Sequence, residues 1–298
     1  MKMRLALAVG LSLSHLAVAG VALADDPPTP AAPAASGAPV PAGDWTPNAT
    51  RQRIELNWDV FPSDGLFVMT WDVGAHLQVA KEVFQPGDSI LAGARYAWGY
   101  LNVSNAGDQA TYGNPSLGAR YTLPLDKYVP DLRAYGGFYW TPPVLSEPEL
   151  AVALTAAIGA TTRGFFDGER LVPGATAFRF DFGAEYRIMP NLYYRGTLNP
   201  VIYVPTRSGG DTELILEQGN EAEYRLDFGL GGGLRFQEAF TLTDADLVQL
   251  ATELFVAYTP EGTGFYGRFG FLLALDQALG FDGAEVHTLR FTAGYQLD

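Results

Sequence analysis

The chain has 298 residues, 48% of them hydrophobic, which is enough for one large domain or two small ones with a sizeable core. It contains no cysteine, which excludes disulfide bonds, thiolate metal sites and cysteine nucleophiles. The formal net charge of −14 argues against nucleic acid as a partner, because phosphate groups are bound by basic surfaces.

The N-terminal residues have the pattern of a secretory signal peptide. Lys2 and Arg4 precede an uncharged apolar stretch, and Ala22 and Ala24 are the small residues that a cleavage site requires. We therefore predict that the protein is exported, that the signal is cleaved near Ala24, and that residues 1–24 take no part in the fold.

Proline, alanine and glycine dominate residues 25–49, where Trp45 is the one large side chain that a core could hold. A segment of this composition cannot recover its ordering entropy through burial. We predict that residues 25–49 are a disordered tether and that the folded domain comprises residues 50–298.

From residue 50 onward, polar and apolar residues alternate. In the segment 179–188, Arg179, Asp181 and Glu185 fall on one side of an extended chain, and Phe180 falls on the other. This two-residue period recurs over stretches of about ten residues between turn signals, which is the pattern of β-strands. Strands are expected near residues 51–60, 66–79, 89–103, 111–124, 132–142, 176–188, 192–205, 211–218, 222–236, 248–259, 264–276 and 286–297.

Three features favour strands that span a membrane over strands of a soluble sheet. The polar sides are rich in glycine, serine, threonine and arginine, with almost no lysine. The apolar sides carry aromatic residues near strand ends, as in aromatic girdles at membrane interfaces. Many strands have about 10–14 residues, which exceeds the usual globular length and suits tilted spans. Because a sheet in lipid must close on itself, we predict an all-β fold, an antiparallel transmembrane β-barrel with its apolar sides outward.

The strand number follows from the position of the chain ends. Both ends of such barrels lie in the periplasm, so the number is even. We predict twelve strands, with ten as the alternative because the strand at 211–218 is short. The turns MPN, QGNE and PEGTG then lie on the periplasmic side, and residues 144–175 form the longest external loop. Helix-forming residues after Pro148 predict a short helix in this loop, outside the barrel or folded into its mouth, where it partly occludes the opening.

The stretch YGNPSLGARYTL at 112–123 combines glycine, arginine and tyrosine in one alternating strand. In this pattern, and in the alternation over roughly residues 50–298, the chain resembles Gram-negative outer-membrane β-barrel proteins of the transporter or porin type. The resemblance implies localisation in the outer membrane, contact with its lipid and lipopolysaccharide, and insertion by the barrel assembly machinery. It also implies passage of a small solute.

The alternation also predicts which side chains project into the barrel. Two interpretations of these mixed charges stay open: they pair across the lumen and fill a narrow barrel, or the arginines select the solutes that pass. Leu226, Phe228 and Leu230 are expected on the lipid side, and acidic residues such as Glu221 are expected in loops. The residues expected in the lumen are Asp72, His76, Arg95, Arg120, Arg133, Arg179, Asp181, Glu185, Arg187, Arg195, Arg225, Asp227, Arg235, Glu253, Arg268 and Arg290.

An enzymatic function would need a nucleophile or base with a polarising partner. His76 lies on the inward side, four residues after Asp72, whereas His287 lies on the outward side near a strand end. The chain has neither a G-x-S-x-G elbow nor a cluster of His, Asp and Glu at metal-ligand spacing. We therefore predict no catalytic residue, no metal site and no cofactor.

The favoured function is that of an integral outer-membrane β-barrel that acts as a passive channel or small-solute transporter. The first alternative is a structural or adhesion barrel with a plugged lumen. The second is an outer-membrane hydrolase centred on His76.

Overall fold

The computed structural model describes residues 51–63, 65–104, 107–144, 159, 163, 166–206, 210–243, 248–260, 262–275 and 287–297. Long antiparallel strands make up most of these residues, and a short 3-10 helix, η1 (Gly168–Arg170), precedes β7. Among them, no helix is long and apolar enough to cross a membrane. The strands are β1 (Arg53–Ser63), β2 (Leu66–Lys81), β3 (Ser89–Val103), β4 (Gly107–Tyr112), β5 (Ser116–Pro124), β6 (Leu132–Thr141), β7 (Ala175–Met189), β8 (Leu192–Pro205), β9 (Glu213–Arg225), β10 (Leu230–Thr241), β11 (Val248–Tyr258), β12 (Phe265–Ala274) and β13 (His287–Gln296).

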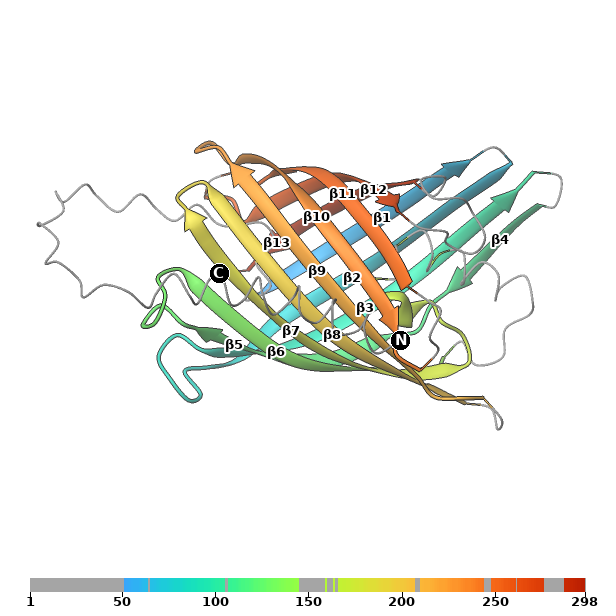
Figure 1. Ribbon diagram of the computed structural model, residues 1–298, viewed down its shortest axis with the longest axis horizontal. Coiled ribbons are helices and arrows are strands. Elements are labelled where there is room, and N and C mark those ends of the chain that lie inside the picture. Colours follow the sequence, from blue (N-terminus) through green and yellow to red (C-terminus); the bar gives the residue numbers. More distant parts are fainter. Residues whose placement is uncertain are drawn as a thin grey trace, which may run out of the picture. The chain divides into compact units, whose positions relative to one another are not determined.

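The strands form one closed antiparallel sheet (Figure 1). From β5 onward each strand pairs with the next, β13 pairs with β1, and the β1–β2 and β2–β3 pairs complete the circle. β4 and β5 pair with successive halves of β3, so together they occupy one strand position. The described part of the chain therefore forms the predicted antiparallel barrel with twelve strand positions. Closure lets the strands satisfy one another's backbone groups, as a lipid environment requires.

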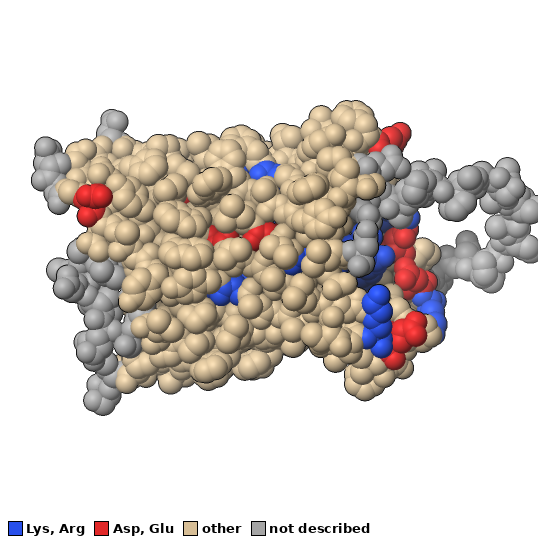
Figure 2. Space-filling model, turned by 180° about the vertical axis from the view of Figure 1, so that it is seen from behind, with Lys and Arg blue, Asp and Glu red and all other residues tan. Residues whose placement is uncertain are grey.

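The outer surface of the barrel is apolar and its inner surface is charged. On β7, the side chains of Phe180 and Phe182 are exposed, whereas those of Arg179, Asp181 and Glu185 are buried. Figure 2 shows one outer face, on which charged side chains are few and gather mainly at one end. The prediction that the apolar sides of the strands point outward is confirmed.

The two ends of the barrel differ in the length of their connections. At the terminal end, where Arg53 pairs with Gln296, short turns such as 190–191 join the strands. The opposite end, called the loop end and seen at the right of Figure 1, carries the connection 142–174 between β6 and β7. Outer-membrane barrels place their termini and short turns in the periplasm, so we expect the loop end to be the external one. The helix predicted after Pro148 lies outside the described residues.

The predicted strands differ from the structure in two places. The strand expected at 111–124 is interrupted at 113–115, between β4 and β5. The strands expected at 211–218 and 222–236 were to be separated by the QGNE sequence, but β9 runs through this sequence and ends at Arg225. The turn to β10 lies at 226–229. Phe228 is exposed, as expected, but it lies in this turn and not in a membrane-spanning strand.

The conformation of two glycines explains where the chain turns. Gly229 has a φ of +88°, and a Cβ atom at this position would lie 2.0 Å from the carbonyl oxygen of Thr259. Glycine alone tolerates this left-handed conformation and this close approach. Gly219 of the QGNE sequence lies instead within β9, paired with Thr197 of β8.

Asp88 holds the turn between β2 and β3. Its carboxylate accepts hydrogen bonds from the backbone N–H groups of Val83 (2.6 Å), Phe84 (2.9 Å) and Gln85 (2.9 Å). The hydroxyl of Tyr121 donates another at 2.6 Å. Burial opposes ionisation of this carboxyl, but the hydrogen bonds outweigh it and lower the pKa of Asp88 below its ordinary value. An ionised side chain therefore organises the turn at neutral pH.

Replacing Asp88 with asparagine should lower the free energy of unfolding at neutral pH. A carboxyl whose pKa is lowered by folding stabilises the folded state above its unfolded-state pKa, and this contribution is lost as the pH falls through the folded-state pKa. The stability difference between the parent protein and Asp88→Asn should therefore narrow on acidification. Urea unfolding in detergent at a series of pH values measures this difference in the free energy of unfolding. A difference that widens toward acid pH would show that an ionised Asp88 does not stabilise the turn.

A substitution at Leu254 tests whether the outer surface of the barrel contacts lipid. Its side chain on β11 is 62% exposed, and it lies opposite Leu234 of β10, which is 49% exposed. Leu254→Arg should lower the free energy of unfolding from a bilayer by about 2–4 kcal/mol, the cost of arginine near the midplane. Tyr128→Arg, in the turn before β6, is the control and should have little effect because that side chain lies outside the strands. Equal stability of both variants would mean that Leu254 does not face lipid.

Candidate functional site

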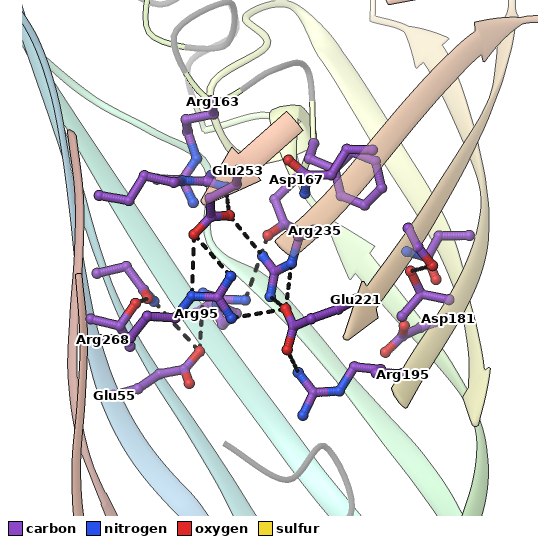
Figure 3. Close-up of a pocket in the computed structure, with 18 of the residues that line it drawn as sticks. Glu55, Arg95, Arg163, Asp167, Asp181, Arg195, Glu221, Arg235, Glu253 and Arg268 are labelled. Atoms are coloured by element: carbon purple, nitrogen blue, oxygen red, sulfur yellow. Dashed lines mark hydrogen bonds and ion pairs between the residues drawn. The ribbon is translucent and has the colours of Figure 1, made fainter. Parts of the chain in front are cut away.

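The side chains on the inner wall form the candidate site (Figure 3). They come from strands all around the barrel, so closure of the sheet brings them together. Of the residues predicted to point inward, the structure places these on the inner wall, buried or half-buried: Asp72, His76, Arg95, Arg120, Arg133, Arg179, Asp181, Glu185, Arg195, Arg225, Arg235, Glu253, Arg268 and Arg290.

Two of the predicted residues lie at the terminal end instead. Arg187 is near the end of β7, where its Nη2 lies 2.7 Å from a carboxylate oxygen of the exposed Asp131. Asp227 is exposed in the turn after β9, because that strand ends at Arg225. Both belong to the rim of the barrel, and the predicted lumen position of Asp227 is wrong.

Glu221, which was expected in a loop, is a centre of the site. It lies on β9 and is buried, because the strand continues through the sequence that suggested a turn. Its carboxylate contacts the guanidinium groups of Arg268 (2.8 Å), Arg195 (3.6 Å) and Arg235. Figure 3 shows these arginines converging on it from different sides of the lumen.

Glu253 on β11 extends this network. Its carboxylate lies 2.9 Å from Arg268, 3.5 Å from Arg235 and 3.3 Å from Arg290. Arg290 also contacts Asp59 of β1 at 2.8 Å. Arginine suits such bridging because its planar guanidinium group offers donors to more than one carboxylate. The network therefore links the wall from β8 to β1.

Asp72 on β2 is the centre of a second network. Its carboxylate contacts Arg95 at 2.7 Å, Arg163 at 2.8 Å and Arg170 at 3.2 Å. Arg95 also lies 3.2 Å from Glu55 of β1. Like Glu221 and Glu253, this buried carboxylate is therefore compensated by three arginines.

Arg163 and Arg170 come from the 142–174 connection and not from the wall. Arg163 also contacts Asp59 at 2.6 Å and so joins the two networks. We did not predict these residues in the lumen, because the connection was expected to be an external loop that at most covers the barrel mouth. The signal that points to them is the sequence RGFFDGER at 163–170, which mixes aromatic and charged residues and is unlike a solvated loop.

The described residues 163 and 166–172 of this connection are called the loop segment below. Arg179 of β7 binds the loop segment to the other side of the barrel. Its guanidinium group contacts Glu217 of β9 at 2.7 Å. It also contacts Glu169 and Asp167 of the loop, each at 3.3 Å. The loop segment is therefore bound to the inner wall by ion pairs on opposite sides.

The loop segment also covers a break in the wall between β4 and β5. The backbone N–H of Asn114 donates to the carbonyl oxygen of Arg170 at 2.6 Å, and its side-chain amide donates to the carbonyl oxygen of Val172 at 2.8 Å. Gly113 permits this approach, since a Cβ atom there would lie 2.2 Å from the carbonyl oxygen of Arg170. Backbone groups that have no neighbouring strand at this point are thus bonded to the loop.

The charged side chains surround a cavity of about 210 Å³ in the lumen. A polar cavity of this size holds several water molecules. Nine arginines and six carboxylates line it, so arginines outnumber carboxylates at its surface. The arginines are Arg53, Arg95, Arg120, Arg163, Arg179, Arg195, Arg235, Arg268 and Arg290, and the carboxylates are Glu55, Asp59, Asp167, Asp181, Glu221 and Glu253. Behind this surface, four further carboxylates (Asp72, Glu169, Glu185 and Glu217) pair with some of the same arginines.

His76 contacts a tyrosine and not a carboxylate. Its Nε2 lies 3.2 Å from the hydroxyl oxygen of Tyr139, while Asp72 is engaged by arginines. The acid–base pair that a hydrolase centred on His76 would need is not formed in this structure. Among the described residues, no group of three or more His, Cys, Asp and Glu side chains is placed to hold a metal ion.

A closed antiparallel wall, an apolar exterior and a charged lumen define the fold of an outer-membrane β-barrel. An outer membrane channel from Pseudomonas putida F1 shares this fold with a TM-score of 0.60 and 10% identity, over 85% of this chain and 100% of that chain. The KdgM porin (TM-score 0.50, 7% identity, 83% and 99% covered) and the NanC porin (TM-score 0.50, 7% identity, 82% and 99% covered) share it too. No protein-family model and no curated protein matches the sequence. The likeness is one of fold, so function has to be argued from the lumen.

Asp72 should contribute far more to stability than Asp131. Asp72→Ala removes a buried carboxylate from three arginines and should lower the free energy of unfolding by about 3–5 kcal/mol. Asp131→Ala removes the exposed partner of Arg187 and should cost only about 0–1 kcal/mol. Urea unfolding of both variants in the same detergent makes the comparison. Similar losses would show that the lumen pairs are no more important than the pair at the rim.

Proposed function

We propose that the protein is an outer-membrane channel through which small polar solutes diffuse passively, with a preference for anions. The observation that carries this proposal is the cavity inside the barrel, lined by nine arginines and six carboxylates. Arginines outnumber carboxylates at the surface of the cavity, and positive groups that face a confined space raise the local concentration of anions. A barrel of about a dozen strands is intermediate between barrels filled by side chains and barrels with wide aqueous pores.

The loop segment makes the proposed channel narrow. Arg163, Phe166 and Asp167 line the cavity, and ion pairs to Asp59 and Arg179 hold the segment across the lumen. A path of this kind admits small solutes and obstructs large ones. The proposal is supported by the similarity in fold to proteins described as an outer membrane channel and as porins.

A structural barrel with a plugged lumen is the second candidate. It is supported by the extent of ion pairing, since the carboxylates of Asp72, Glu221 and Glu253 each contact three arginines. In this second candidate the arginines stabilise the wall, and the barrel lets no solute through. Neither candidate uses His76 as a catalytic base, because this side chain contacts Tyr139 and the neighbouring Asp72 contacts arginines.

Several expectations accompany the proposal and follow from an outer-membrane location. Residues 1–24 would direct export and residues 25–49 would form a disordered tether. Lipopolysaccharide would surround the external part of the barrel, and the barrel assembly machinery would insert it.

Planar-bilayer recordings test the proposed channel. The parent protein should conduct, and its reversal potential in a KCl gradient should show a preference for anions. Arg235→Gln should shift this potential toward cations, because Arg235 lines the cavity and its side chain remains 25% exposed there. Arg187→Gln removes one arginine at the rim and is the matched control, which should leave the potential unchanged.

Absence of conductance in the parent protein would favour the plugged barrel. Equal shifts in the two variants would contradict selection by the cavity, since total charge would then explain the effect.

A further inference from the structure

The turn between β2 and β3, residues 82–88, holds the most exposed large hydrophobic side chain among the described residues. The side chain of Phe84 in this turn is 81% exposed. A single exposed hydrophobic residue is common on protein surfaces and needs no explanation by itself. Here, however, the turn is built to hold Phe84 in place, and it holds it on a particular side of the barrel.

The β2–β3 turn is held in one conformation by several contacts. The carboxylate of Asp88 accepts hydrogen bonds from three consecutive backbone N–H groups, including that of Phe84. The side-chain amide of Gln85 donates to the carbonyl oxygen of Pro124 at 3.1 Å, which ties the turn to the end of β5. Glu82 has a φ of +52°, a left-handed conformation that is unfavourable for a residue with a side chain. Such strain persists only where the surrounding contacts enforce it, so the exposure of Phe84 belongs to an ordered turn.

Phe84 lies on the outer side of the barrel wall. Its ring packs edge-on against the ring of Tyr121 on β5, with 5.7 Å between the centroids and 76° between the planes. Tyr121 is on the outer side of β5, because its neighbours Arg120 and Thr122 are buried on the inner side. The turn therefore places Phe84 over the outer surface, where the rest of its ring is exposed to whatever surrounds the barrel.

The apolar outer side of β2 leads directly to this turn. Leu77 and Val79, near the end of the strand, are 45% and 64% exposed on the outer side. Lys81 and Glu82 follow them and are exposed as well. Charged side chains are costly among lipid tails, so these two residues mark the level at which the hydrocarbon layer ends. Phe84 lies beyond them in the chain and is therefore placed at the boundary between lipid and water.

The side chains at this boundary fit the chemistry of phospholipid headgroups. Aromatic residues favour the interfacial layer of a membrane, where an apolar ring contacts lipid beside polar groups. A zwitterionic headgroup carries a phosphate and an ammonium group, and the turn offers charges of both signs in Lys81 and Glu82. The lipid-facing side of β2 continues into the turn, so lipid is the occupant that reaches Phe84 without a change of surroundings.

We propose that the β2–β3 turn is an interfacial anchor, with Phe84 inserted among the phospholipid headgroups at the terminal end of the barrel. The contacts of Asp88 and Tyr121 fix the ring over the outer surface, so that it enters the interface already ordered. The anchor sets the depth at which the side of the barrel formed by β2, β3 and β5 lies in the membrane. It is independent of the proposed channel, because Phe84 does not border the lumen.

The absence of cysteine allows the depth of single positions to be measured. Phe84→Cys, Leu77→Cys and Thr263→Cys each give one thiol for a bimane label, and Thr263 is an exposed polar residue in another turn at the terminal end. The labelled proteins are folded into vesicles of phosphatidylethanolamine and phosphatidylglycerol that contain no other protein. Because the side chain of Phe84 is 81% exposed, its replacement should leave the fold intact, which circular dichroism checks.

The label at position 84 should be quenched most strongly by lipid with a nitroxide on its headgroup, and it should lose most of the iodide quenching seen at position 263. The label at position 77 should be quenched most strongly by lipid with a nitroxide in the middle of its acyl chain. Equal iodide quenching at positions 84 and 263 would overturn the anchor, since Phe84 would then lie in water. Equal depth at positions 84 and 77 would overturn the interfacial location.

A comparison with native outer membranes distinguishes lipid from a partner protein. If lipid is the occupant, the label at position 84 should be protected from iodide to the same degree in phospholipid vesicles and in native membranes. Protection in native membranes alone would mean that another protein covers Phe84, and it would refute the anchor.

Discussion

In lipid, every backbone polar group needs a hydrogen-bond partner within the protein, and the structure depends on this requirement. An open sheet would leave two edges unbonded in the membrane, so pairing of β13 with β1 and of β2 with β3 is what makes the fold possible. Closure then places the two sides of each alternating strand in different environments, one outside the barrel and one inside it. Residues such as Trp58 and Leu254 face outward, while Asp72 and Glu253 are enclosed. The charged interior is therefore a consequence of the closed wall.

Charges inside such a wall have to compensate one another. A buried charge without a partner is strongly destabilising, and arginine provides partners for several carboxylates at once. Asp72, Glu221 and Glu253 each contact three arginines, and Asp59 links their networks through Arg163 and Arg290. Except for Arg170, these arginines also line the cavity in the lumen. Stability of the barrel and the proposed selection of anions thus depend on the same side chains.

One feature interrupts the regular wall. Between β4 and β5 the ladder stops, and the backbone of Asn114 bonds to Arg170 of the loop segment instead of to a strand. A backbone group that the sheet itself does not satisfy is satisfied here by the loop segment packed against it.

The sequence by itself determined the fold class, the number of strand positions and the inward side of most strands, because the two-residue period is a local property of an extended chain. It misplaced Glu221 and Asp227, since Gly219 and Asn220 look like a turn while the actual turn depends on Gly229 packing against Thr259 of another connection. Tertiary structure alone decided which charges meet. Arg163 and Asp72 are 91 residues apart and bond only because the loop enters the lumen. Such pairs depend on the register around a closed wall, and no local pattern in the chain encodes that register.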